Sequence, residues 1–101
     1  MPDEHNKHIT EALGGQYIPP MTHEERKERE RVRNLIEGVA TCYNSLVHLE
    51  TDDARRDELL AKRAHYDEEF RRRGSMTPEE RQEVLRTYPA LLSQLRTELG
   101  E

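Results

Sequence analysis

The sequence predicts an all-α protein: a small antiparallel three-helix bundle with a flexible N-terminal arm. Apolar residues recur every three or four positions along three separate segments, which is the period of an amphipathic helix. Helix-start and turn signals separate these segments, and the alternating pattern of strands is not seen. At 101 residues the chain holds one domain at most. We place that domain at 22–101 and the arm at 1–21.

Two nearly identical stretches predict two of the helix starts. "MTHEER" at 21–26 and "MTPEER" at 76–81 differ at one position. Each holds a threonine followed three residues later by a glutamate, namely Thr22 with Glu25 and Thr77 with Glu80. This spacing is typical of a capping box, in which both side chains bind backbone N–H groups of the first helical turn. The apolar positions that follow the two boxes do not correspond, so we interpret them as independent helix starts and not as a duplication.

The first helix is expected from Thr22 to about Glu50 and carries the widest apolar stripe. At about 100° per residue the stripe covers about 160° of the helix surface, so it needs two neighbours. Its members are Val32, Leu35, Ile36, Val39, Cys42, Tyr43, Leu46, Val47 and Leu49. Gly38 lies beside the stripe in a seam of small and polar residues with Asn34, Thr41 and Ser45. Because a glycine inside a helix costs about 1 kcal/mol relative to alanine, we expect a helix or a ligand to approach closely there.

The second and third helices follow after a turn within "ETDDARRDE", where Thr51, Asp52 and Asp53 supply a cap and negative charge for the start of the second helix. The second helix is expected to end near Arg73, with Gly74 in the left-handed capping conformation. Its apolar seam is narrow: Leu59, Leu60, Tyr66 and Phe70. The third helix should start at Thr77 and kink or restart near Pro89, because proline lacks a backbone N–H and clashes with the preceding turn. Its apolar face holds Val84, Leu85, Tyr88, Leu91, Leu92, Leu95 and Leu99.

The arm differs from the rest of the chain in its composition. Residues 3–13 could form a short helix, and the following "GGQYIPP" indicates an extended segment because of its paired glycines and prolines. Tyr17 and Ile18 are the apolar residues that could anchor this segment on the bundle. We otherwise expect the arm to be flexible.

Composition and charge exclude several classes of function. The net charge of −5 and the mixed signs argue against nucleic-acid binding, which normally requires a basic surface. No apolar run resembles a signal peptide or a membrane span, and the single cysteine, Cys42, cannot form an intramolecular disulfide. We therefore expect a cytoplasmic protein that does not bind membranes. We find no metal-ligand set, cofactor motif or catalytic constellation; the spacing of His65 and Glu69 fits a surface pair as well as an oriented imidazole.

The residues that could bind a ligand are arginines and tyrosines. Arg56 and Arg63 share one line on the second helix, and Tyr43, Tyr66 and Tyr88 lie on apolar faces. The arginine stems could simply cover the edge of the core. Alternatively, the guanidinium groups could join the tyrosines in a site for a carboxylate or phosphate.

Two functions follow from these observations. The first is a non-enzymatic protein-interaction module, an accessory or regulatory protein that acts through its helical surface and arm. The alternative is a small-molecule binder, or a small enzyme without a known motif, that holds an anionic ligand with Arg and Tyr side chains. Because the second helix has few apolar residues, we also expect Leu35, Cys42 and Leu49 to stay uncovered in one chain. A homodimer packed across Gly38 would bury them.

Overall fold

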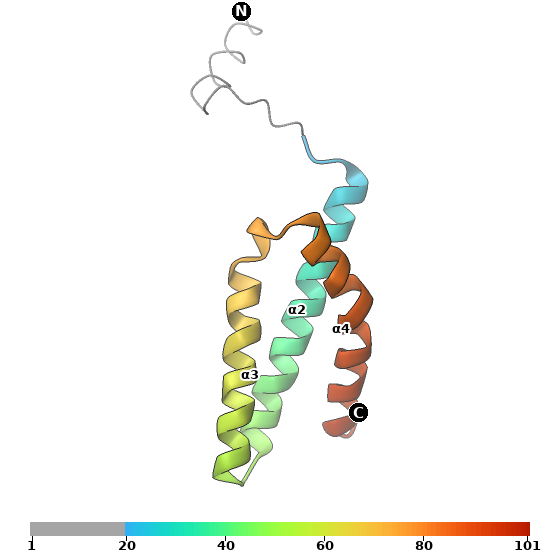
Figure 1. Cartoon of the computed structure of the whole chain (residues 1–101). Coiled ribbons are helices and arrows are strands. Elements are labelled where there is room, and N and C mark those ends of the chain that lie inside the picture. The colour runs from blue at the N-terminus through green and yellow to red at the C-terminus, as the bar shows by residue number, and fades with distance from the viewer. Residues whose placement is uncertain (1–19) are drawn as a thin grey trace, which may run out of the picture.

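The computed structural model describes residues 20–101 and contains three α-helices in this region (Figure 1). These are α2 (His23–Leu49), α3 (Asp53–Arg71) and α4 (Pro78–Glu98), with a short 3-10 turn, η1 (Arg73–Ser75), before α4. α3 runs antiparallel to α2, and α4 runs antiparallel to α3 (Figure 1). The all-α three-helix bundle predicted from the sequence is confirmed. Residues 1–19, with the expected short helix over 3–13 and the anchors Tyr17 and Ile18, lie outside the described residues.

Each helix starts at a capping side chain, but of the two predicted capping boxes the one at Thr22 forms only the hydrogen bond to the threonine side chain. Thr22 Oγ1 accepts a hydrogen bond from the Glu25 backbone N–H at 3.1 Å. At the start of α4 the capping box is complete, because Thr77 Oγ1 accepts from the Glu80 N–H at 3.1 Å and the Glu80 carboxyl accepts from the Thr77 N–H at 3.2 Å. α3 starts with Asp52 accepting from the Arg55 N–H at 2.9 Å. The three starts are therefore local features of the sequence.

The end of α3 differs from the prediction. Gly74 does not adopt the left-handed conformation; among the glycines of residues 20–101, positive φ occurs at Gly100 alone, at 84°. The chain tightens into η1, and the carbonyl of Arg72 accepts from both the backbone N–H and the hydroxyl of Ser75, at 3.0 and 2.9 Å. This carbonyl at the helix end is therefore satisfied without a left-handed residue.

The core is one apolar cluster built around α2. Ile36 and Val39 are fully buried at its centre, and residues from α3, α4 and the loop before α4 surround them. Leu35 and Cys42 are 9% and 7% exposed, so the expectation that they stay uncovered in one chain is wrong. Leu49, at 68%, is exposed as expected.

Gly38 is a point of close packing between α2 and α4. A Cβ atom built on Gly38 would lie 3.3 Å from both terminal methyl carbons of Leu92. The close approach predicted at Gly38 is therefore made by a helix of the same chain. The homodimer inferred from this position loses its original reason, because α4 already fills the space.

α4 continues through Pro89 without a restart. Its ribbon changes direction about halfway along its length (Figure 1), which is the response expected of a helix that loses one hydrogen bond to proline. Val84 before the proline and Leu92 and Leu95 after it are all buried. Packing on both sides of Pro89 therefore keeps the two halves in one helix.

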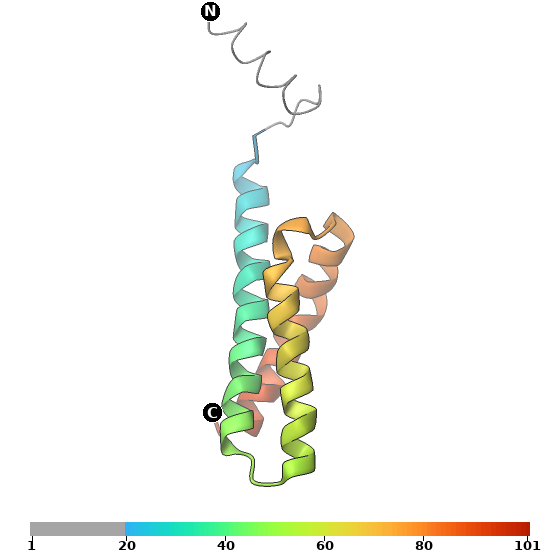
Figure 2. The same ribbon diagram turned by 90° about the vertical axis from the view of Figure 1, so that its left-hand side faces the viewer.

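α3 and α4 both pack along α2 and diverge from one another toward the C-terminal end of α4 (Figures 1 and 2). The first turns of α2 extend beyond the other two helices (Figure 2), and residues 23–27 are exposed. No helix within residues 20–101 combines the length and the apolar character that crossing a membrane requires. The divergence of α3 and α4 leaves open the groove described below.

Candidate functional site

The three tyrosines selected from the sequence meet inside the bundle, one from each helix. The rings of Tyr43 and Tyr66 stack with centroids 5.4 Å apart and planes 7° apart. Tyr88 meets Tyr66 edge-on at 5.7 Å. Burial raises the pKa of all three hydroxyl groups above the usual range. This tyrosine cluster fills the space between the helices with aromatic contacts, and of its three rings Tyr43 alone borders one of the hollows described below.

A buried carboxyl group adjoins the tyrosine cluster. Glu69 is 8% exposed and accepts a hydrogen bond from the Tyr88 hydroxyl. On its outer side, the exposed His65 places Nε2 3.7 Å from Glu69 Oε2. Burial first, and then the hydrogen bond to Glu69, raise the pKa of Tyr88 far above its ordinary value. Tyr88 therefore stays protonated and serves as the donor that a buried carboxyl needs.

Arg56 does not join the tyrosines. Its guanidinium group donates to the backbone carbonyl of Glu50 at 3.2 Å from Nε and 2.5 Å from Nη2, and pairs with Asp53 at 3.3 Å. Glu50 is the C-cap of α2. Arg56 therefore fixes the turn between α2 and α3 by satisfying a carbonyl at a helix end.

Arg63 also binds away from the tyrosines. Its Nη1 donates to Asn44 Oδ1 at 2.9 Å, and its Nε lies 4.0 Å from Asp67 Oδ2. It borders a hollow of about 490 Å³ between α2 and α3 that neither Arg56 nor any residue of the tyrosine cluster lines. The predicted site combining Arg56, Arg63 and the tyrosines is therefore not assembled.

Cys42 packs in the core as a small apolar residue. Burial raises the pKa of its thiol, which disfavours the reactive thiolate. Within residues 20–101, no group of three or more His, Cys, Asp or Glu side chains is arranged to hold a metal ion.

A groove between α3 and α4 is the most defined opening that involves a tyrosine. It has a volume of about 410 Å³, and one apolar side chain from each helix forms its base: Tyr43, Leu59 and Leu95. Ala61 and charged or polar residues line its walls: Arg55, Glu58 and Lys62 on α3, and Gln94 and Glu98 on α4. The region described by the structure thus has an apolar groove with charges of both signs along its borders. We refer to it as the α3–α4 groove.

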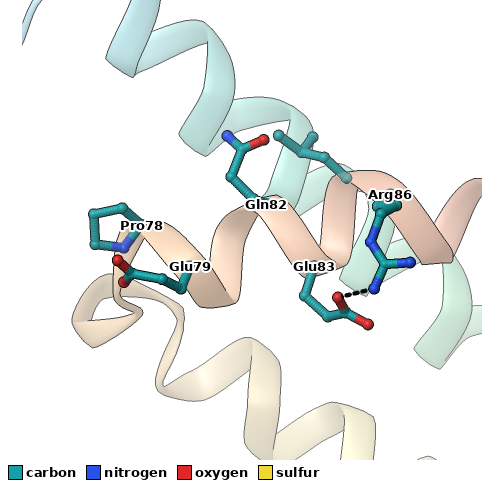
Figure 3. A pocket seen from close by; sticks show the side chains of 6 residues that line it. Pro78, Glu79, Gln82, Glu83 and Arg86 are labelled. Atoms are coloured by element: carbon teal, nitrogen blue, oxygen red, sulfur yellow. Dashed lines mark hydrogen bonds and ion pairs between the residues drawn. The ribbon is translucent and has the colours of Figure 1, made fainter.

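A larger hollow, of about 670 Å³, lies over the first three turns of α4 (Figure 3). All of its described lining residues belong to α4, and Glu83 and Arg86 pair with each other across its surface (Figure 3). A hollow lined by one helix has no facing wall to enclose a ligand. The α3–α4 groove, with walls from two helices, is the better candidate site.

Comparison with known protein families, curated proteins and solved structures finds no match to this chain. The functional argument therefore starts from the geometry.

Sequence reasoning selected Tyr43 for this region but missed the residues that surround it. The sequence analysis placed Leu59 and Leu95 on apolar helix faces and assigned no role to Glu58, Lys62 or Glu98. A signal for the groove was present in the narrow apolar seam of α3, which is too small to cover both α2 and α4. Locating the groove also required the direction in which α4 crosses α2, and the apolar pattern of a single helix does not determine that direction.

Proposed function

We propose that this chain is a non-enzymatic protein-interaction module that binds an amphipathic helix of a partner protein in the α3–α4 groove. The supporting observation is the groove itself, which has an apolar base from three helices and charged walls on two of them. A helix placed there would complete a four-helix arrangement around the tyrosine cluster. Helix-in-groove binding uses apolar residues at positions i, i+3 or i+4, and i+7.

The dimensions of the groove fit a short helical segment. Its wall on α3 extends from Arg55 to Lys62, which corresponds to about two helical turns, or about 10 Å. Two turns of a partner helix can present two or three apolar side chains to Tyr43, Leu59 and Leu95. The affinity of such a contact depends on those few anchors and on the fit of the charged borders.

The charges along the borders select the partner. On α3, Arg55 already pairs with Glu58 at 3.0 Å. Lys62 is therefore the wall residue that favours acidic residues on the adjacent flank of a docked helix, whereas Glu98 on α4 favours a basic residue on the opposite flank. The expected partner segment therefore has an apolar stripe with acids on one side and a base on the other.

A partner protein is a better occupant than a second copy of this chain. Within residues 20–101, the large apolar residues that are exposed are Met21 and Leu49. They lie at opposite ends of α2, so this part of a second copy offers no apolar helix face to insert into the groove. This favours a different protein over the homodimer expected from the sequence.

Site-specific photocrosslinking tests the proposal. A photoreactive residue replaces Ala61, which is exposed and lines the groove, or Ala90, which is exposed on α4 and does not line it. In native cells, the Ala61 variant should capture a partner through an amphipathic segment and the Ala90 variant should not. The purified partner should then bind the native chain, and the charge reversal Lys62→Glu should weaken this binding about tenfold, which corresponds to about 1.4 kcal/mol.

Two results would refute the proposal. Equal capture from Ala61 and Ala90 would mean that the groove is not the contact surface. A crosslinked product of twice the chain mass, with a dimer in sedimentation equilibrium, would mean that the occupant is a second copy.

A further inference from the structure

We propose that the protein has a second binding site, for a small molecule carrying a phosphoryl group, in a pocket lined by four arginines. The pocket has a volume of about 260 Å³ and lies between α2, η1 and the start of α4. Its basic residues are Arg29, Arg33, Arg73 and Arg81, and its other lining residues are Glu30, Val32 and Gly74. We refer to it as the arginine pocket. The α3–α4 groove shares no lining residue with it.

The concentration of basic groups is not a consequence of overall composition. The chain carries a net charge of −5, yet four arginines and one acid line this pocket. Like charges repel when they share a partly enclosed space, so their grouping is costly unless an anion offsets it. Glu28 and Glu37 pair with two of these arginines from beside the pocket, so the positive charge left for a ligand comes mainly from Arg29 and Arg73.

Two of the arginines are held in place by the fold. Arg81 is 8% exposed, donates from Nε to Glu28 at 2.8 Å and from Nη1 to the Met76 carbonyl at 2.9 Å. Arg73 donates to the Phe70 carbonyl at 2.8 Å, and its guanidinium carbon lies 4.1 Å from the centre of the Phe70 ring. These contacts organise the wall before any ligand arrives, which lowers the entropic cost of binding.

The other two arginines keep binding capacity for a ligand. Arg29 makes no ion pair or hydrogen bond within residues 20–101, and its Nε atom is buried there without a partner. Arg33 has a loose pair with Glu37, at 3.7 Å, and both side chains are about half exposed. Because the Nε atom is shut off from the surface, a bound oxyanion would contact the terminal nitrogens of Arg29, for which residues 20–101 supply no acceptor.

The arrangement favours a phosphoryl group over a carboxylate. Guanidinium groups approach from three structural elements, and a guanidinium group with free terminal nitrogens can bind an oxyanion through two parallel N–H donors. Arg81 keeps only part of this capacity, because its Nε and Nη1 atoms already donate within the chain. A phosphate monoester has three terminal oxygens and up to two negative charges, whereas a carboxylate has two oxygens and one charge. The volume of about 260 Å³ leaves space for a small organic group beside the phosphoryl group, against Val32 and Gly74.

Binding by the full chain tests this site with three probes: inorganic phosphate, glycerol phosphate and acetate, each at constant ionic strength. Phosphorus NMR and calorimetry should detect saturable binding of both phosphates, with glycerol phosphate tighter, and no comparable binding of acetate. Arg29→Lys keeps the charge but loses the paired terminal N–H donors, so it should weaken phosphate binding about tenfold or more. Arg86→Lys, on the outer face of α4, is the matched control and should leave binding unchanged.

Thermal melting supplies an independent readout. Arg29→Met removes the buried unpartnered donor, so it should raise the melting temperature without phosphate and abolish the increase that phosphate produces in the native chain. If Arg29→Met does not fold, Arg33→Lys gives the same test of binding from an exposed position. The proposal is overturned if phosphate binding does not saturate, if acetate binds equally well, or if Arg86→Lys weakens binding as much as Arg29→Lys.

Discussion

The hydrogen bond between Tyr88 and Glu69 provides a sharp test of how the bundle is held together. Tyr88→Phe removes the hydroxyl that donates to a carboxyl group only 8% exposed. A hydrogen bond to a charged group contributes about 1.5–3 kcal/mol. His65 remains 3.7 Å from the other carboxyl oxygen and compensates in part, so we expect a loss of about 2 kcal/mol. For a domain of this size that loss lowers the melting temperature by about 8–16 °C.

Urea unfolding followed by circular dichroism measures this loss, and Tyr66→Phe is the matched control. The Tyr66 hydroxyl makes no hydrogen bond within the described part of the chain, although its ring lies in the same cluster. Removing it should therefore change stability by less than about 0.5 kcal/mol. The comparison separates loss of a hydroxyl group from loss of the Glu69 interaction.

A double variant tests the physical reason for the loss. Glu69→Leu in the Tyr88→Phe background removes the carboxyl group that the first change leaves without its donor. Replacing both partners by apolar groups can be nearly neutral, so the double variant should recover much of the stability. If Tyr88→Phe costs no more than Tyr66→Phe, or if the two losses simply add, the reasoning about a buried carboxyl is wrong.

Three further predictions concern pH, helix capping and Gly38. Burial raises the pKa of each tyrosine in the cluster, so these tyrosines should ionise in the unfolded chain before they ionise in the folded one, and stability should fall above about pH 10. The absorbance of tyrosinate during an alkaline titration measures this. Ionisation of the three tyrosines in the folded chain at the ordinary tyrosine pKa would contradict it. Thr77→Ala should cost about 1 kcal/mol, and Thr22→Ala should cost less because its helix start extends beyond the bundle; equal losses in thermal melts would argue against this. Gly38→Leu should cost about 1–3 kcal/mol by overpacking against Leu92. Gly38→Ala should be close to neutral in urea unfolding, because its gain in helix propensity of about 1 kcal/mol offsets a small shift of the Leu92 methyl groups. A neutral Gly38→Leu would mean that α4 does not pack against α2 at this position.

The helix starts were predictable because their signals are local. Thr22, Asp52 and Thr77 each bind a backbone N–H three residues ahead, and a contact over that distance depends on very little else in the fold. The end of α3 was less predictable. Gly74 is suited to a left-handed cap, but the chain forms a 3-10 turn instead, in which the Ser75 hydroxyl donates to the Arg72 carbonyl at the helix end. Two local solutions competed, and sequence spacing alone does not decide between them.

The arginine pocket was not predictable from spacing because its walls depend on the path of the chain after α3. Arg29 and Arg33 are one turn apart on α2, but Arg73 and Arg81 reach them only through η1 and the loop before α4. The sequence analysis instead paired Arg56 with Arg63, which share one helix. It thus recognised that arginines could bind an anion and chose two whose donors the backbone and Asn44 already occupy.

The prediction that apolar surface of α2 stays uncovered was wrong for Leu35 and Cys42, which are buried. The wide stripe of α2 does need two neighbours, and α4 supplies the second one by packing Leu92 against Gly38. What remains short of apolar cover is the space between α3 and α4, because Leu59, Tyr66 and Phe70 of the narrow α3 seam pack into the core or against it. The charged residues on either side of Leu59 on α3, namely Arg55, Glu58 and Lys62, then border the groove. Interaction with a partner helix would therefore follow from the same shortage of apolar residues on α3 that first suggested a homodimer.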